Sequence, residues 1–386
     1  MIFCSIESLG DRPVTTLNLL ERLGALPDHR VAKKTRHRLD EIVFVAICAV
    51  VSGAEGWSDI VEFAQAKLDW LRRFVRLQHG IPVDDTYARV LSVVSPKALT
   101  ECLLAWTQDL AAQCPGEVIA IDGKSVRRSH DRKARRHPLH LVRAWASGQG
   151  LALGMVKTDV KSNEITAIPE LLSFLELKGA LVTIDAMGCQ TTIAEQIVRQ
   201  GGDYLLAVKD NQPTLHETLR DFFTTARAHN FAGVSHTFAE TVDAGHGRIE
   251  TRRCWASDCL QTVAEPQRWT GLKSLVMIER ERWVGDAISL EQAYFISSAA
   301  AQADRLGEAV RAHWSIENSC HWVIDVSFNE DQSRIRRGDS AQNFALLRQF
   351  ALNLMKQNSA KASIRKKLFR ASLNDEFRFQ VLAGTG

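Results

Sequence analysis

The spacing of apolar side chains makes the first third of the chain helical. Apolar residues recur every three or four positions over 39–52 and 58–77, and glycines separate the two stretches. This period is typical of helices that bury one face. Pro96 can begin a further helix that runs toward residue 112, because proline is favoured in the first helical turn. We therefore expect residues 1–112 to form a helical N-terminal domain.

Beyond residue 112 the pattern changes to short apolar runs that alternate with helical segments. The strand-like runs cover 118–122, 140–146, 151–157, 180–185 and 204–208. Helical segments separate the third, fourth and fifth runs. This β-β-β-α-β-α-β order predicts an α/β core with buried, partly parallel strands.

A segment of different character interrupts this core. Pro213 begins a helix, and three strands are expected near 248–256, 272–283 and 290–297. A long helical pattern resumes at about residue 304 and continues past residue 321. We therefore divide the chain into the helical N-terminal domain (1–112), the first part of the core (113–212), a β-rich insertion (213–303), the rest of the core (304–360) and a basic, frayed C-terminal tail (361–386).

Composition excludes several classes of protein. The 386 residues are 45% hydrophobic and 24% charged, as in ordinary globular chains. The longest strongly apolar stretch, 42–51, is half of the roughly 20 residues that a membrane span needs. The first residues lack the basic region of a signal peptide, and the eight cysteines form no CxxC pair. We expect a cytoplasmic protein with free thiols and no membrane partner.

Positive charge is concentrated although the net charge is only +3. Basic blocks lie at 30–38, 124–136 and 361–370. The middle block holds Lys124, Arg127, Arg128, Arg132, Lys133, Arg135 and Arg136. Such blocks either form solvated surfaces or neutralise a polyanion, and three of them on a nearly neutral chain favour a nucleic-acid partner.

Two aspartates share one setting. Asp122 and Asp185 each end an apolar run of the predicted core, in the sequences AIDG and TIDA. Ligands of open α/β sheets bind at the carboxyl ends of strands. If the two strands are parallel neighbours, both carboxylates emerge at the same rim. The alternative is that each aspartate only caps the turn that follows it.

A third carboxylate lies in the long helical pattern. At about 100° per residue, Glu317 falls on the same face as Leu306, Val310 and Ile324, which we expect to pack on the sheet. A carboxylate on a buried face is costly unless it is paired or bound to a metal ion. A salt bridge to a core Arg or Lys is the alternative. His313 and His321, one turn to either side, are ligands or core histidines.

Three carboxylates suit hard divalent cations, Mg²⁺ or Mn²⁺. Two such ions about 4 Å apart activate a water or a 3′-hydroxyl and stabilise the leaving oxygen of a phosphoryl displacement. Basic blocks beside such a centre point to a nucleic-acid phosphodiester as substrate.

Six motifs then resemble one known family. They are IPVDDT from Ile81, IDGKS from Ile121, TIDAMGCQ from Thr183, YLLAVKDNQ from Tyr204, HGRIE from His246 and HWSIEN from His313. In this order they resemble the H-repeat-associated (Rhs-linked) insertion-sequence transposases, the ISAs group of the DDE transposase superfamily. The similarity covers roughly residues 15–356. It implies an α/β, ribonuclease H-like catalytic core with a β-strand insertion, and it implies that Asp122, Asp185 and Glu317 are the metal-binding catalytic triad.

The chain departs from the wider family around Glu317. Where that family has Tyr, Arg and Lys, this chain has Val310, His313 and Ile324. Two alternatives remain for the phosphate contacts. Either His313 supplies part of them, or Arg334, Arg336 and Arg337 supply them from downstream. Lys124, Lys209 and Arg248 adjoin matched motifs and are further candidates for contacting DNA. Three tryptophans are candidates for stacking on bases, although Trp314 is expected in the core; they are Trp145, Trp255 and Trp314.

The leading hypothesis is a transposase that binds terminal inverted repeats and joins them to target double-stranded DNA, using two Mg²⁺ or Mn²⁺ ions. We expect a homodimer or a higher assembly on DNA, associated with the nucleoid. A nuclease that cuts without joining, and a non-catalytic DNA-binding relic, are the alternatives. Three dispersed, intact acids disfavour the relic.

Overall fold

A computed structural model describes residues 14–31, 33, 35–110, 116–130, 137–158, 164–245 and 247–384. The chain divides into two compact units, which are treated separately below. The first unit combines residues 1–112 with 126–139 and 321–386. The second combines residues 113–125 with 140–320.

The described part of the first unit is helical. Its helices are α1 (Val14–Gly24), α2 (Leu39–Val51), α3 (Trp57–Ala66), α4 (Leu68–Leu71), α5 (Asp84–Leu91), α6 (Pro96–Leu110), α11 (Trp322–Phe328), α12 (Ser340–Gln357), α13 (Ile364–Leu373) and α14 (Asp375–Leu382). The apolar stretch 42–51 forms most of α2, which is buried almost all round and packs against α12. Across the described ranges, no helix combines the length and the apolar character that crossing a membrane requires.

Two expectations for this unit are corrected. The helix predicted over 58–77 is two shorter helices, α3 and α4, because the backbone leaves helical geometry at Lys67 (φ −116°, ψ 22°). The C-terminal segment is not frayed over residues 375–382, because these residues form α14, which buries Phe377 and Val381. The guanidinium of Arg378, also buried, lies 4.0 Å from the ring centroid of Trp70.

The second unit is built on one nine-stranded sheet of order β3-β2-β1-β4-β5-β9-β8-β7-β6. Its strands are β1 (Val118–Val126), β2 (Leu139–Ala146), β3 (Leu151–Thr158), β4 (Leu181–Ile184), β5 (Asp203–Val208), β6 (His236–Gly245), β7 (Arg248–Ser257), β8 (Ser274–Val284) and β9 (Ala287–Ser297). Its helices are α7 (Glu164–Ser173), α8 (Thr191–Arg199), α9 (Pro213–Ala228) and α10 (Ala303–His313). The predicted β-β-β-α-β-α-β order and the mixed α/β fold are confirmed.

Helices cover both faces of the central strands. Ile121 of β1 and Ile184 of β4 join a core with residues of α7, α8 and α9, such as Leu171. On the opposite face, Leu181 packs with Leu306 of α10. Because side chains alternate along a strand, Asp122 lies on the α10 face of the sheet.

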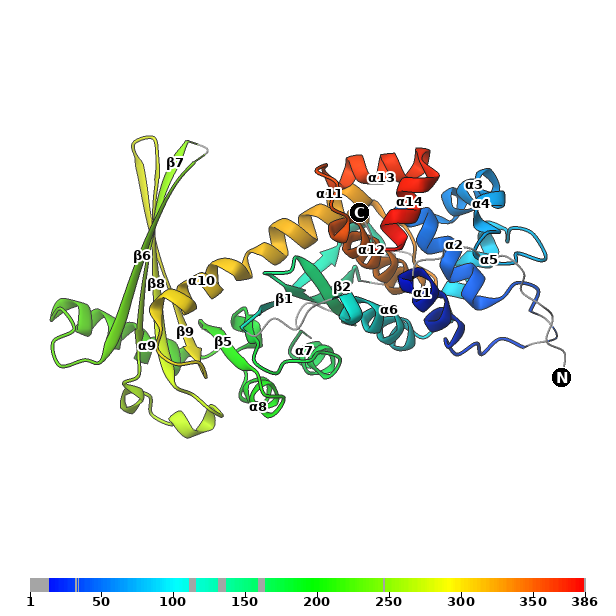
Figure 1. The fold of residues 1–386 in the computed structure, drawn as a ribbon. Coiled ribbons are helices and arrows are strands. Elements are labelled where there is room, and N and C mark those ends of the chain that lie inside the picture. Colours follow the sequence, from blue (N-terminus) through cyan, green and yellow to red (C-terminus); the bar gives the residue numbers. More distant parts are fainter. Residues whose placement is uncertain are drawn as a thin grey trace. The chain divides into compact units, whose positions relative to one another are not determined.

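The insertion extends this sheet. Strand β9 runs antiparallel to β5 and is followed outward by β8, β7 and β6, which Figure 1 shows as long, twisted strands. The strands continue from Tyr294, opposite the end of β5, to Ala287, which at about 3.3 Å per residue makes an arm of roughly 23 Å. This arm projects past the carboxyl end of β5. Strand β6 was not predicted, because its side chains are mostly exposed and polar and so lack an apolar alternation.

Candidate active site

The two aspartates follow directly from paired residues. Strands β1 and β4 are parallel neighbours, and Ile121 lies opposite Ile184 in their register. The next residues are Asp122, which lies inside β1, and Asp185, which is the first residue after β4. The predicted parallel pairing is therefore confirmed, whereas the prediction that Asp122 ends its strand is wrong, because β1 continues to Val126.

The surroundings of Asp185 disfavour a negative charge. Burial raises the pKa of Asp185, and the charges of Glu164 and Asp122 raise this pKa further. The backbone N–H groups of Gly188 and Met187 lower it, and the N–H of Met187 donates to Asp185 Oδ1 at 3.1 Å. The aspartate does cap the turn that follows, as the alternative interpretation holds. However, a role as a turn cap does not explain why the carboxylates of Glu164 and Asp122 are near enough to raise the pKa of Asp185.

A bound cation would offset the repulsion between these carboxylates, so the donor set fits a hard divalent metal ion. Asp122 and Asp185 are the residues that would hold it. In the part of the chain that the structure describes, no three His, Cys, Asp or Glu side chains form a group that could hold a metal ion as they stand. Glu317 therefore does not form such a group with the two aspartates as they stand.

The predicted environment of Glu317 is wrong. Glu317 is exposed, and it begins a π-helical turn, Glu317–His321, between α10 and α11. The buried line of this segment runs through Leu306, Ala309, Ile316 and Cys320. Ala309 and Cys320 are buried, whereas Val310 is half-buried and Glu317 is exposed, so the buried face lies to one side of the predicted one. What supports a role for Glu317 is its motif, and π-helical turns are frequent at functional sites.

The end of α10 is tied to β4. Thr183 Oγ1 and His313 Nδ1 are 2.9 Å apart, and Thr183 lies two residues before Asp185. His313 is half-buried, whereas His321 is buried in the first unit. A hydrogen bond to the sheet makes His313 a residue that holds this helix as well as a candidate for contacting phosphate.

The three tryptophans differ from the expectation. Trp314 is 49% exposed instead of lying in the core, and the guanidinium of Arg280 lies 5.7 Å from its ring centroid. Trp145 is buried and donates to Ser315 Oγ at 3.0 Å, and Trp255 is also buried. Among these three, Trp314 is the one whose ring is accessible to a base.

The basic candidates of the second unit lie at or beyond the rim. Lys209 is exposed directly after β5, and Lys124 is half-buried on β1. Arg248 is exposed at the tip of the arm, opposite Gly245 and Val284. These positions leave Lys124 and Lys209 close in sequence to the strand ends and Arg248 far along the arm.

The other basic candidates belong to the first unit. Arg127 Nε lies 3.3 Å from Asp331, and Arg336 donates to the backbone oxygen of Arg128 at 3.1 Å. Arg334, Arg336, Arg337 and Trp57 help to line a pocket of about 470 Å³. Four residues of the middle basic block lie outside the described residues; they are Arg132, Lys133, Arg135 and Arg136.

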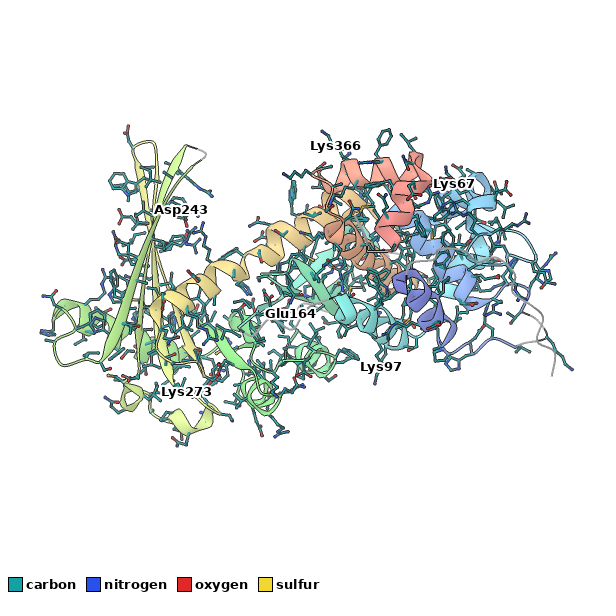
Figure 2. All side chains as sticks on the ribbon, viewed as in Figure 1. Lys67, Lys97, Glu164, Asp243, Lys273 and Lys366 are labelled. Atoms are coloured by element: carbon teal, nitrogen blue, oxygen red, sulfur yellow. The ribbon has the colours of Figure 1, made fainter. Side chains whose placement is uncertain are left out.

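Sequence reasoning missed an arginine-rich face of the arm. Arg252, Arg280 and Arg282 surround the buried Glu250 at 2.7, 4.0 and 3.7 Å. Asp243, labelled on the arm in Figure 2, binds both Arg252 and Arg311 of α10 at 2.7 Å. A signal was available, because Arg248, Glu250 and Arg252 alternate as residues on one face of a strand do, and so do Arg280 and Arg282.

Comparison with known families covers most of the chain. Residues 113–354 match the model described as Transposase DDE domain, and residues 20–107 match the one described as DDE_Tnp_1-associated. The H repeat-associated putative transposase YhhI of Escherichia coli (strain K12) is 41% identical over 378 residues, 95% of this chain and 98% of that protein. The putative transposase YncI of Escherichia coli O157:H7 is 41% identical over 95% of this chain and 94% of its own length.

Among solved structures, a piggyBac transposase synaptic complex with hairpin DNA aligns with 95% of this chain and 76% of its own, at 11% identity and a TM-score of 0.41.

Proposed function

The chain belongs to the family of transposases with a DDE domain, and from that premise we propose that it acts as an insertion-sequence transposase. It binds the terminal inverted repeats of its element, cuts one strand of each end in a metal-dependent step, and transfers the exposed 3′-hydroxyl to target DNA. The observation that supports this function most strongly is the pairing of Ile121 with Ile184, whose next residues are Asp122 and Asp185.

Each carboxylate has a proposed role. Asp122 on β1 and Asp185 directly after β4 would hold two Mg²⁺ or Mn²⁺ ions, and Glu317 would add a ligand from the helical turn. Bound metal ions supply activation of the attacking water or 3′-hydroxyl and stabilisation of the leaving oxygen. Thr183 orients His313, which positions the Glu317 segment against β4.

DNA binds along the basic surfaces of the two units. In the second unit, Lys124 and Lys209 contact phosphates near the scissile bond, and the arginine-rich face with Arg248 contacts the duplex farther away. Trp314, with its exposed ring, stacks on a base. In the first unit, Arg127, Arg128, Arg334 and Arg336 contribute phosphate contacts, and residues 1–112 help to recognise the element's ends.

The working form is a homodimer or a higher assembly on DNA. An element has two ends that must be joined to one target, and two active sites in one complex provide this. We place the activity at the DNA of the nucleoid in the cytoplasm.

The test is incubation of the full chain with end DNA, a target plasmid and Mg²⁺ or Mn²⁺. A transposase gives nicks that leave 3′-hydroxyl groups at the element's ends, followed by joined product. Nicks without joined product would indicate the nuclease alternative. Retarded DNA with neither product would indicate a non-catalytic binder, provided that every metal and end sequence tested gives the same result.

The arm has its own test. Each lost phosphate contact lowers the slope of log affinity against log salt by about 0.9. Replacing Arg252, Arg280 and Arg282 by Gln should therefore reduce this slope by two or more. The matched control is Arg253→Gln, whose guanidinium lies on the opposite face of the arm and pairs with Glu240 and Glu281. Equal slopes for the triple variant and the wild type would show that this face of the arm does not contact DNA.

A further inference from the structure

Three side chains in hydrogen-bond contact with one another lie behind Asp122 and Asp185. Glu164, labelled in Figure 2, begins α7 and is 3% exposed. Its Oε1 is 2.6 Å from Nε2 of His140 on β2, and His140 Nδ1 is 2.8 Å from Oγ of Ser125 on β1. These contacts therefore connect α7 through β2 to β1, the strand that carries Asp122.

Gly123 makes room for these side chains. A Cβ at Gly123 would lie 2.3 Å from Glu164 Oε1 and 2.6 Å from His140 Nε2, so any other residue there would displace these side chains. Gly123 is not among the glycines with positive φ, so space and not backbone conformation favours glycine at this position. The carboxylate of Glu164 thus packs against the β1 backbone at the residue that follows Asp122.

Glu164 also acts electrostatically on the aspartate site. Its carboxylate lies against the strand position that follows Asp122, so its charge reaches this site through the β1 backbone. A buried acid and a histidine are costly to desolvate, and apolar residues of similar volume would be at least as stabilising at a purely structural position. The surrounding core is otherwise apolar, with Ile121 and Ile168 on this face of the sheet.

We propose that Glu164 is a positioning residue of the aspartate site. Held by His140, which Ser125 contacts in turn, it adds a negative charge behind Asp122 and Asp185 and so strengthens their binding of a divalent cation. It acts through space and not as a metal ligand. This role rests on the proposed function, since it requires that the two aspartates bind metal.

The test measures Mn²⁺ binding to the full chain by calorimetry, without DNA and at one neutral pH. Glu164→Gln should weaken Mn²⁺ binding at least about tenfold, because a negative charge behind the two aspartates is removed. Glu170→Gln is the matched control, because Glu170 is an exposed carboxylate on the same helix and should leave the affinity unchanged. Glu164→Asp, which keeps the charge, should restore most of the affinity.

A merely structural role would lower the melting temperature of Glu164→Gln but leave the Mn²⁺ affinity of the folded protein within twofold of the wild type, and that result would overturn the proposal. If Glu164→Gln does not fold, His140→Gln decides, because it releases the carboxylate from its fixed position. A roughly threefold loss of affinity is expected for this variant, and no loss would overturn the proposal.

The same titration separates this inference from the proposed function. Binding that Asp122→Asn abolishes but Glu164→Gln leaves intact would overturn the role of Glu164 alone. Wild-type protein that binds no Mn²⁺ would overturn both.

Discussion

The adjacent strands β1 and β4, which position Asp122 and Asp185, differ sharply from the helical turn that carries Glu317. The aspartates follow in-register partners on adjacent strands, and Asp185 is held by the N–H of Met187. The carboxylate of Glu317 is exposed and makes no hydrogen bond or ion pair with any residue that the structure describes. Asp122 and Asp185 are held in place before metal binds, and their negative charges repel each other. The side chain of Glu317 can reorient. The fixed region should therefore govern metal affinity, and Glu317 should contribute mainly when DNA is bound.

The strongest test of the fixed region is Asp122→Asn. Strand cleavage should fall by at least about 10²–10³-fold, the loss seen when one group that stabilises the transition state is removed. Affinity for end DNA should stay within about threefold, because the basic residues that neutralise phosphates remain. Cleavage is measured on labelled end DNA with Mg²⁺, and binding by fluorescence anisotropy. A parallel loss of both activities would mean that Asp122 maintains the fold and not the chemistry.

Glu317→Gln tests the other side of the comparison. Cleavage should again fall, by about 10²-fold, because a ligand needed in the transition state is lost. Mn²⁺ affinity of the DNA-free protein should change far less than in Asp185→Asn, because the exposed Glu317 lies outside the fixed pair. Calorimetry on both variants measures this difference. Equal losses of Mn²⁺ affinity would show that the three carboxylates act as one preformed site and would break the comparison.

The repulsion at Asp185 gives a prediction about stability. The pKa of Asp185 is raised above its ordinary value of 3.8, so the folded chain holds this proton more tightly than the unfolded chain. Ionisation of Asp185 therefore destabilises the fold at neutral pH, and this destabilisation shrinks as the pH falls through the raised pKa. With EDTA present, Asp185→Asn should raise the melting temperature at pH 7 by roughly 1–3 °C.

Thermal unfolding across pH checks the sign. The difference between Asp185→Asn and the wild type should disappear below the ordinary value of 3.8, where both folded and unfolded chains are protonated. Mg²⁺ should stabilise the wild type more than the variant, because only the folded wild type keeps both ligands. A variant that is less stable at pH 7 would mean that the carboxylate is needed as a cap for the turn at Met187.

The two regions also differ in how far sequence predicts them. The parallel pairing beside Asp122 and Asp185 was predictable, because both aspartates follow apolar runs that are typical of buried strands. The continuation of β1 to Val126 was not, because residues 123–126 are not an apolar run. The exposure of Glu317 and Trp314 was not, because a helical projection depends on the residue chosen as its centre and the π-helical turn then changes the period. Glu164 was invisible for another reason. It lies 24 residues from His140, and only the folded sheet brings the pair behind Gly123.

The smallest expected effect concerns the hydrogen bond that joins the two regions. Thr183 lies two residues before Asp185 and its Oγ1 is 2.9 Å from Nδ1 of His313, which lies four residues before Glu317. Thr183→Val keeps the branched shape but removes the hydroxyl. A single hydrogen bond contributes about 0.5–1.5 kcal/mol, so cleavage should fall about two- to tenfold while Mn²⁺ affinity stays unchanged. Thr183→Ser, which keeps the hydroxyl, should cleave at nearly the wild-type rate. If Thr183→Val reduced Mn²⁺ affinity as Asp185→Asn does, the helical turn would control the strand ends directly, and the division into a fixed and a reorienting region would be wrong.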